Sequence, residues 1–246
     1  MIIKKLFNYK SYNIRKYEFK EKKREEIAHS CNSIGDLHWE IGNHEKARKF
    51  FDIALKDQIM LFGENHGDYA TSLSNIGSVY ASLGKYEDGK DYYEKALKIS
   101  KFGENHGLCA KLFKKIADIE ETLGNYKTTL EYLEKALEID KELFGEDHSS
   151  FASTLQQIGE CLHNMGNHQQ ALEYLNRALK IQLKFGENYP GTALTYNDIG
   201  LAHNSLGDFE EAMHNYELAL KICQRIYGEN HEKTATTLNC IGGTYH

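Results

Sequence analysis

Four histidines recur in equivalent places and raise the question of a metal site. His66, His106, His148 and His231 each close a Gly-Glu-Asn or Gly-Glu-Asp sequence, in four similar segments of the chain. If these segments stack as layers of helices about 8–10 Å apart, the imidazoles cannot all come within the roughly 2.0–2.1 Å that zinc requires. We therefore expect loop residues and no metal. His163 and His168 straddle a turn without further ligands nearby, so no metal is expected there either.

The cysteines and the motif content give no sign of catalysis or of a cofactor. The five cysteines are odd in number and include no Cys-x-x-Cys pair, which excludes a disulfide framework and favours a cytoplasmic, reduced protein. No phosphate-binding GxGxxG or GxxxxGK[ST] sequence occurs, and no GxSxG sequence. Cys240 has no His or Asn to activate it as a nucleophile. We expect no enzyme and no cofactor. No run of 18 apolar residues predicts a membrane span.

Three separate markers repeat along the chain with one period. Ile followed by Gly or Ala occurs at residues 34–35, 76–77, 116–117, 158–159, 199–200 and 241–242, in steps of 42, 40, 42, 41 and 42 residues. A second Gly follows seven residues later in the first five copies, and a third lies in each FGEN-like loop. Such a period indicates stacked structural repeats.

Each repeat predicts a helix, a tight turn, a second helix and a loop. Apolar residues of the first half recur at steps of three and four, as in Tyr69, Leu73 and Ile76. The second half begins with residues typical of helix N-caps, and Asp208 with Glu211 has the spacing of a capping box. These N-cap candidates are Asn43, Asn125, Asn167 and Asp208. Repeat two is two residues shorter than three other copies, so its second helix should be about half a turn shorter. We also expect a change of the superhelix between repeats two and three.

The constellation within each repeat resembles the tetratricopeptide repeat. Repeat two shows Gly77, then Leu83-Gly84-Lys85-Tyr86, Tyr93 and Ala96. The period near 42 residues and the FGENH loop are similar to the subclass of kinesin light chains. The resemblance implies an all-α fold, a right-handed α-solenoid of stacked helix–turn–helix repeats. It covers residues 28–246 and says little about which partner is bound, because this scaffold serves many.

The resemblance also implies a concave groove lined by the first helix of each repeat. Copying the groove positions of the family onto this sequence gives a row that is mostly amide, hydroxyl or charged. The residues expected to bind a peptide are Asn32, Trp39, Ser74, Asn75, Lys111, Lys114, Lys115, Gln156, Gln157 and Asn197. Amide side chains both donate to and accept from a peptide backbone, so the row suits an extended peptide.

Two interpretations of the three lysines stay open. Lys111, Lys114 and Lys115 either form a positive spot for an acidic residue of a linear peptide or are solvated surface lysines. Asn75, Lys111 and Lys115 match half of the carboxylate clamp that some members of the family use for chaperone C-termini. The other half fails, because Asn32 stands where Lys is needed and Asp36 would repel a carboxylate.

Charge divides the chain into an arm and a body. Residues 1–24 hold nine Lys or Arg against two Glu, and the remaining residues have a net charge of −13. We predict a basic N-terminal arm or lead-in helix at residues 1–26, then a repeat array at residues 27–246 with five repeats and a sixth half-repeat. The arm either is solvated or fills the groove. Its Phe7, Tyr9, Tyr12 and Tyr17 alternate with basic residues and are the only support for nucleic-acid binding, which the acidic body disfavours.

The expected function is that of a protein–protein interaction scaffold or adaptor, with a peptide or helix in the groove and no catalysis. The alternative is a structural or regulatory segment of a larger protein or assembly that associates through its open C-terminal end. In that case the protein associates with itself or with a neighbouring domain.

Overall fold

The computed structural model describes residues 22–64, 66–102, 106–186 and 189–244. These residues form helices joined by short turns, with no strand among them. The chain divides into two compact units, Met1–Lys115 and Ile116–His246, and the division falls inside one helix, α5 (His106–Thr122). The predicted all-α fold of stacked helix–turn–helix units is confirmed. The expected change of the superhelix concerns the join of the two units and stays a prediction.

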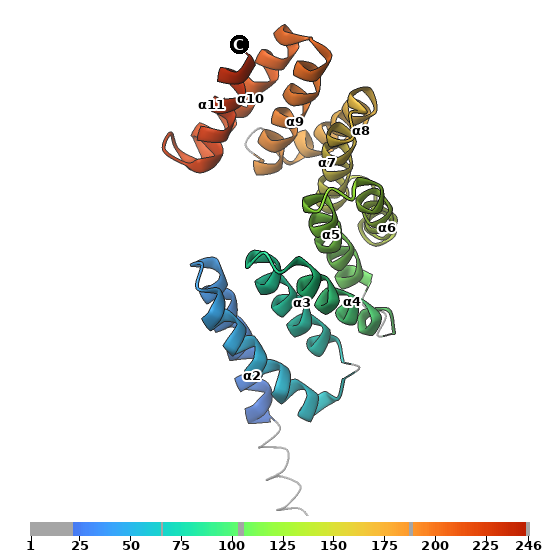
Figure 1. Ribbon diagram of the computed structural model, residues 1–246, viewed down its shortest axis with the longest axis vertical. Helices are drawn as coiled ribbons and strands as arrows, with labels where there is room; N and C mark the ends of the chain where they lie inside the picture. The colour runs from blue at the N-terminus through green and yellow to red at the C-terminus, as the bar shows by residue number, and fades with distance from the viewer. Residues whose placement is uncertain (1–21, 65, 103–105, 187–188, 245–246) are drawn as a thin grey trace, which may run out of the picture. The chain divides into compact units, whose positions relative to one another are not determined.

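The first unit contains two complete helical hairpins and the beginning of a third (Figure 1). Residues 22–40 form one continuous helix, which the tight turn at residues 41–43 connects to the second helix of repeat one. Residues 1–21 lie outside the described residues, and with them most of the predicted arm. The labelled helices of this unit are α2 (His44–Phe62), α3 (Gly67–Ser82) and α4 (Tyr86–Phe102), followed by the first part of α5.

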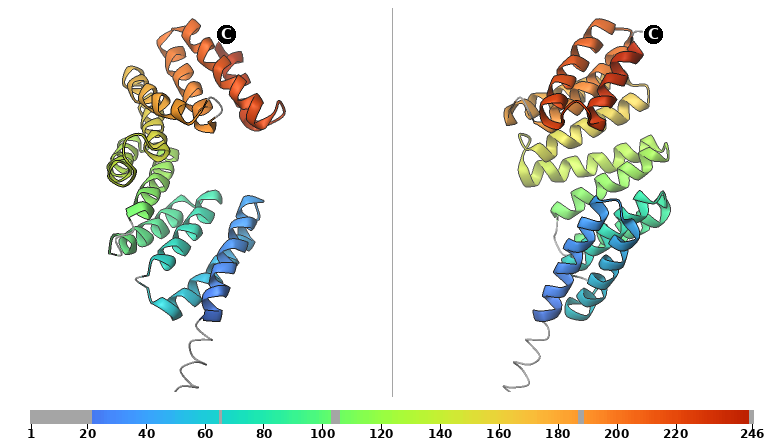
Figure 2. Two further views of the ribbon diagram at one scale, coloured as in Figure 1. Left: turned by 180° about the vertical axis from the view of Figure 1, so that it is seen from behind. Right: turned by 90° about the vertical axis from the view of Figure 1, so that its left-hand side faces the viewer.

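The second unit repeats the same arrangement through repeats three to five and the half-repeat. Neighbouring helices in sequence pack side by side from α6 to α11, as the two further views in Figure 2 also show. The elements are α6 (Tyr126–Phe144), α7 (Ser149–Asn164), α8 (His168–Gln182), the 3₁₀ turn η1 (Leu183–Phe185), α9 (Pro190–Leu206), α10 (Phe209–Tyr227) and α11 (Glu232–Thr244). As expected, α4 has 17 residues where α2, α6 and α10 have 19.

Three of the four recurring loop histidines, His66, His148 and His231, cap the first helices of their repeats. Nδ1 of His66 accepts a hydrogen bond from the backbone N–H of Asp68 at 3.2 Å, and Nδ1 of His148 does the same with Ser150 at 3.1 Å. Each ring also stacks on the aromatic residue four positions earlier, with the His148 centroid 4.5 Å from that of Phe144. These contacts satisfy one unpaired N–H of the helix and fix the loop. Their type and spacing had predicted loop residues, without this capping role.

The second helices begin at the predicted N-cap residues, but the expected side-chain hydrogen bonds of these caps are absent. Asn43, Asn125, Asn167 and Asp208 do occupy the N-cap positions, but none of their side chains makes a cap hydrogen bond. The tight turn leaves these residues with ψ of 53–67°, outside the extended region that an N-cap usually adopts. Two of the side chains contact the preceding helix instead: Asn125 Nδ2 donates to Glu120 Oε2 at 2.8 Å, and Asp208 Oδ2 lies 3.3 Å from His203 Nδ1.

The marker glycines let the two helices of a hairpin approach closely. A Cβ at Gly200 would lie 2.5 Å from the ring of Tyr216, and a Cβ at Gly77 would lie 2.7 Å from the ring of Tyr93. Tyr216 is fully buried, so its ring has no room to move. The second helix therefore sits where it does because the first helix has no side chain at this position. Gly242, the equivalent of Gly200 in the half-repeat, has no atom within 4 Å of such a Cβ.

We expect Gly200→Ala to destabilise the protein and Gly242→Ala to leave it unchanged or slightly more stable. The first substitution overpacks the contact with Tyr216, which costs about 1–3 kcal/mol. The second places the better helix former in a helix at an open position, which gains up to about 1 kcal/mol. Urea unfolding of both variants measures the difference. Equal destabilisation by the two substitutions would show that the close approach at the marker glycine does not hold the hairpin.

Candidate peptide-binding groove

A polar hollow lies between the helix of residues 22–40 and α3 in the first unit. Its volume is about 330 Å³, and its wall includes Asn32 and Asn75, two of the residues expected to contact a peptide. We call it the polar hollow. The residues that line it are Glu25, Ala28, His29, Asn32, Ser33, Asp36, Gln58, Phe62, Asp68, Thr71 and Asn75. Three of these carry carboxylates and none is Lys or Arg, so the hollow is acidic.

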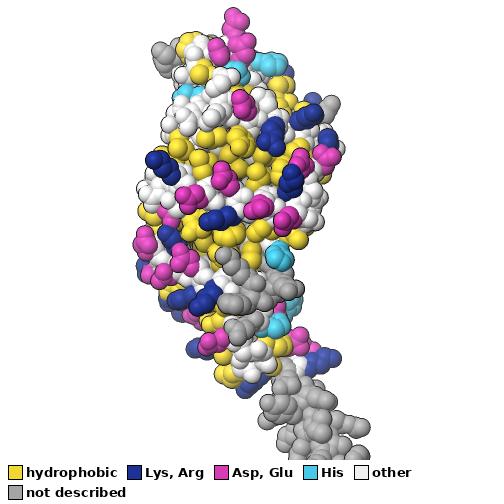
Figure 3. Space-filling view, turned by 90° about the vertical axis from the view of Figure 1, so that its right-hand side faces the viewer, with side chains coloured by type: hydrophobic (Ala, Val, Ile, Leu, Met, Phe, Trp, Pro, Cys, Tyr) yellow, Lys and Arg dark blue, Asp and Glu magenta, His cyan; other side chains and the backbone are white. Residues whose placement is uncertain are grey.

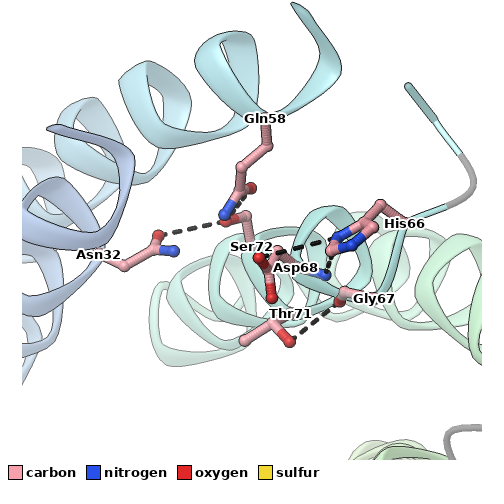
Figure 4. Close-up of polar contacts among 7 residues, drawn as sticks. All are labelled: Asn32, Gln58, His66, Gly67, Asp68, Thr71 and Ser72. Atoms are coloured by element: carbon pink, nitrogen blue, oxygen red, sulfur yellow. Dashed lines mark hydrogen bonds and ion pairs between the residues drawn. The ribbon is translucent and has the colours of Figure 1, made fainter. Parts of the chain in front are cut away.

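Hydrogen bonds between repeats one and two form the back of the polar hollow (Figure 4). The hydroxyl Oγ of Ser72, a buried residue of α3, lies 2.7 Å from Gln58 Oε1 and 3.1 Å from Asn32 Oδ1. At the mouth, Asn75 Nδ2 donates to Asp36 Oδ1 at 3.4 Å. Burial and, second, the charge of Glu40 raise the pKa of the Asp36 carboxyl.

A smaller hollow of about 90 Å³ adjoins the polar hollow, because Asp36 and Asn75 line both. We call it the tryptophan hollow, since Trp39 forms one side of it. The Trp39 side chain is 40% exposed, and its Nε1 donates to Ser82 Oγ at 3.2 Å. Trp39, one of the residues expected to bind a peptide, therefore lies at the surface of the tryptophan hollow, with its Nε1 hydrogen-bonded to α3.

The three lysines of α5 differ in how they are held. Lys115 lines the tryptophan hollow, its Nζ donates to Ser78 Oγ at 2.7 Å, and it lies 5.6 Å from the centroid of the Tyr93 ring. Lys114 is half-buried and Lys111 is exposed. Of the three, Lys111 is the side chain most open to water.

Two other expected groove residues, Ser74 and Asn197, are buried. Ser74 is 5% exposed and Asn197 is 8% exposed. Asn197 Nδ2 donates to Thr237 Oγ1 at 2.9 Å, so this amide links α9 to α11. Both residues lie three positions before the marker glycine, on the edge of the first helix that meets the next repeat.

In the second unit, the expected groove residues Gln156 and Gln157 join neighbouring repeats. Gln156 Nε2 donates to Asp198 Oδ2 at 2.6 Å, and Gln157 Nε2 donates to Asp118 Oδ1 at 3.1 Å. The carboxylates that surround them, with Glu121 and Glu160, form an acidic ladder along α5, α7 and α9. We use this name for Asp118, Glu121, Glu160 and Asp198.

Burial and mutual repulsion act on the carboxyls of the acidic ladder. The pKa of Asp198 is raised well above its ordinary value, by burial first and by the charge of Glu160 second, against the hydrogen bond from Gln156. The pKa of Glu160 is raised by burial and by the charges of Glu121 and Asp118. The ladder therefore costs the folded state free energy whenever all of its groups are ionised.

The histidine pair at the α7–α8 turn and the cysteines lie in packed surroundings. Nδ1 of His163 lies 3.1 Å from Nδ1 of His168 across the turn between α7 and α8, and no group of three metal-ligating side chains occurs in the described part of the chain. Burial and the charge of His168 lower the pKa of His163. Four cysteines are buried, and burial raises the pKa of Cys161 to about 12, which keeps it a thiol at neutral pH.

The face drawn in Figure 3 differs from both hollows. Lys and Arg side chains are interspersed there with Asp and Glu, and apolar side chains lie between them. Mixed charge of this kind is typical of an ordinary solvated surface. The described helices include none long and apolar enough to span a membrane.

Comparison with known proteins agrees with this architecture. The tetratricopeptide repeat profile matches residues 25–101, 108–184, 150–223 and 191–246, which together cover most of the chain. The chain belongs to the tetratricopeptide repeat family. No curated protein matches it.

Several solved structures share this tetratricopeptide repeat fold. BtubC (BKLC) from P. vanneervenii is 21% identical, with a TM-score of 0.76 over 90% of this chain and 89% of that one. A putative kinesin light chain with nearly identical repeats from Podosopora anserina is 17% identical, with a TM-score of 0.66 over 81% of this chain and 96% of that one. A Rap protein complexed with competence and sporulation factor is 16% identical, with a TM-score of 0.72 over 96% and 67%. The resemblance to kinesin light chain repeats noted in the sequence is thus found in structure as well.

We expect Asp198→Asn to raise the melting temperature by a few degrees at pH 7.5 and to change it little at pH 4. A carboxyl whose pKa is raised by folding stabilises the fold when protonated, and that contribution is lost as the pH rises from its unfolded value of about 3.9 through its folded pKa. Asparagine removes the loss and can still accept the hydrogen bond of Gln156. Glu173→Gln, at an exposed site of α8, is the control. A melting temperature that falls at both pH values in Asp198→Asn would contradict this account.

Proposed function

We propose that this tetratricopeptide repeat chain is a protein–protein interaction scaffold, or adaptor, that holds a peptide or helix of a partner along the first helices of its repeats. The observation that carries the proposal is the pair of adjoining hollows in the first unit. They are lined by Asn32, Trp39, Asn75 and Lys115, which were predicted from the sequence to face the groove. The proposal includes no chemical reaction.

The chemistry of the hollows supports an extended peptide as the ligand. Amide and hydroxyl groups can donate to a peptide carbonyl or accept from a peptide N–H. The half-exposed Trp39 ring offers apolar surface of the kind that dominates binding energy at interfaces. The Rap protein with a similar fold was solved in complex with competence and sporulation factor, so this scaffold can hold a partner.

The proposal extends to the lysines of α5. An acidic residue of the peptide would lie against Lys111 and Lys114, which are spaced to share one helix face. A cytoplasmic setting is part of the proposal as well, since all five cysteines are free thiols.

We expect a displayed peptide library to yield binders to the intact chain, with an acidic residue in common. Affinity should fall about tenfold in Lys111→Ala/Lys114→Ala, because a charge-assisted hydrogen bond contributes about 1.5–3 kcal/mol. The matched control is Lys95→Ala/Lys98→Ala, which removes the same charge from exposed sites of α4. Fluorescence anisotropy with the selected peptides gives the dissociation constants.

If the selected peptides lose the same affinity in both double variants, the lysines of α5 do not contribute to the binding site. No enrichment at all, together with a mass that rises with concentration in sedimentation, would favour the alternative function. The chain would then be a structural or regulatory segment that associates with copies of itself or with another domain.

A further inference from the structure

We propose that α11 binds an amphipathic helix of a partner protein, on the side where the other first helices carry the second helix of their own repeat. We call this side the open face of α11 and define it by Ala235, Leu238 and Gly242. It belongs to the second unit and shares no residue with either hollow. The inference therefore goes beyond the proposed function and adds a second binding surface to it.

The open face corresponds to a surface that is buried in every complete repeat. Ala235 and Leu238 are both exposed, and Leu238 is 47% exposed. The equivalents of Leu238 in repeats two and four, Leu73 and Leu155, are at most 4% exposed. The equivalents of Ala235 are at most 3% exposed in all five complete repeats, and they are Ala28, Ala70, Ala110, Ala152 and Ala193. The described residues thus leave uncovered on α11 an apolar surface that the fold covers elsewhere.

The opposite side of α11 holds this helix in place. It packs against α10 (Figure 1), and its residues Thr234 and Thr237 are fully buried. Thr237 also accepts the hydrogen bond from Asn197 of α9. The open face is therefore a preformed surface on a packed helix.

The complete repeats define which side chain fits beside the glycine of the open face. In four of them, a Leu, Phe or Tyr of the second helix lies 2.5–2.7 Å from a Cβ built on the marker glycine. These pairs are Gly35 with Phe51, Gly77 with Tyr93, Gly159 with Leu175, and Gly200 with Tyr216. At Gly242, no atom of the described residues lies within 4 Å of such a Cβ. A helix that packs here has room for one Leu, Phe or Tyr at this point.

The packing of α8 on α7 supplies the rest of the pattern. Ala152 and Leu155 of α7 form one buried cluster with Ala178 and Ile181 of α8. The α8 residues that meet α7 are therefore Leu175, then Ala three residues later, then Ile after three more. The same order occurs in α10, as Tyr216, Ala219 and Ile222. The helix that fits α11 carries this order and runs antiparallel to it, because the glycine near the end of α7 meets the start of α8.

A partner protein provides such a helix more readily than a second copy of this chain does. Every second helix among the described residues already packs its Leu, Phe or Tyr inside its own hairpin. These side chains are at most 2% exposed, and they are Phe51, Tyr93, Leu133, Leu175 and Tyr216. A second copy would have to open one of its own repeats to supply the helix, whereas a stacked helix from a partner continues the arrangement of the array.

The test uses the intact chain and a fluorescent peptide with the sequence of residues 208–227, acetylated and amidated at its ends. This peptide contains the pattern, and we expect saturable binding in fluorescence anisotropy. Replacing the tyrosine that corresponds to Tyr216 by alanine in the peptide should weaken binding about tenfold, as expected for a buried aromatic anchor. Phenylalanine should bind about as well as tyrosine, because Phe51 fills the same place in repeat one.

Variants of the chain locate the binding site. Gly242→Leu fills the space of the incoming side chain and should weaken binding about tenfold, since overpacking of this kind is costly. Leu238→Asp, on the same face, should also weaken it. Gly243→Leu is the matched control, because it adds the same side chain about 100° around the helix, at another position with no described atom within 4 Å. All three variants should keep the melting temperature of the parent to within a few degrees.

Three results would overturn the proposal. The first is no saturable binding of the peptide, and the second is equal affinity in Gly242→Leu and Gly243→Leu, which would place the peptide elsewhere on the chain. The third is self-association of the chain in sedimentation that Gly242→Leu abolishes, because a second copy would then cover the open face. The display selection with the lysine variants of α5 decides the proposed function separately, since none of those variants alters α11.

Discussion

Close packing of the first helix against the second, at a glycine in four of the five complete repeats and at Ala117 in repeat three, is the contact on which the rest of the structure depends. Where Gly200 meets Tyr216, the buried ring occupies the space in which any Cβ would lie. The same contact recurs between Gly35 and Phe51 and between Gly77 and Tyr93. It fixes the spacing within a hairpin, and each hairpin then buries its remaining apolar face on the next one. The polar edges of the first helices are thereby left for other contacts.

The hairpins were predictable from the sequence because their determinants are local and repeated. Period, apolar steps and glycine positions together indicated every helix pair, and the shorter second helix of repeat two followed from counting residues. The turn chemistry was not predictable in this way. Asn125 has the right side chain for a cap, but the backbone of the tight turn directs that side chain back to Glu120. The cap of the first helix comes instead from histidine, for example His148, whose ring is positioned by the aromatic residue four places earlier.

The candidate site was predictable only in part, for a geometric reason. Positions that face the groove on an isolated first helix also border the first helix of the next repeat. Asn75 therefore reaches the hollows, whereas Ser74, one residue earlier, is buried. Gln156 and Gln157 were expected to present their amides to a ligand, yet their Nε2 atoms donate to carboxylates of adjacent repeats. Sequence periodicity identifies the helix face, but side-chain length and the neighbouring residue decide which groups stay available.

In each unit, ionised carboxylates on the first helices lower the stability of the folded state. Burial raises the pKa of Asp36 in the first unit and of Asp198 in the second, so ionisation of either group at neutral pH opposes folding. Packing does not require acidic residues at these positions, since repeat two has Asn75 at the position of Asp198 and Ser78 at the position of Asp36. In the second unit, hydrogen bonds from Gln156 and Gln157 offset part of this cost within the fold itself. In the first unit, the Asn75 amide is 3.4 Å from Asp36, a weak contact. The exposed, weakly hydrogen-bonded carboxylate of Asp36 thus differs from the half-buried carboxylate of Asp198, which Gln156 holds at 2.6 Å.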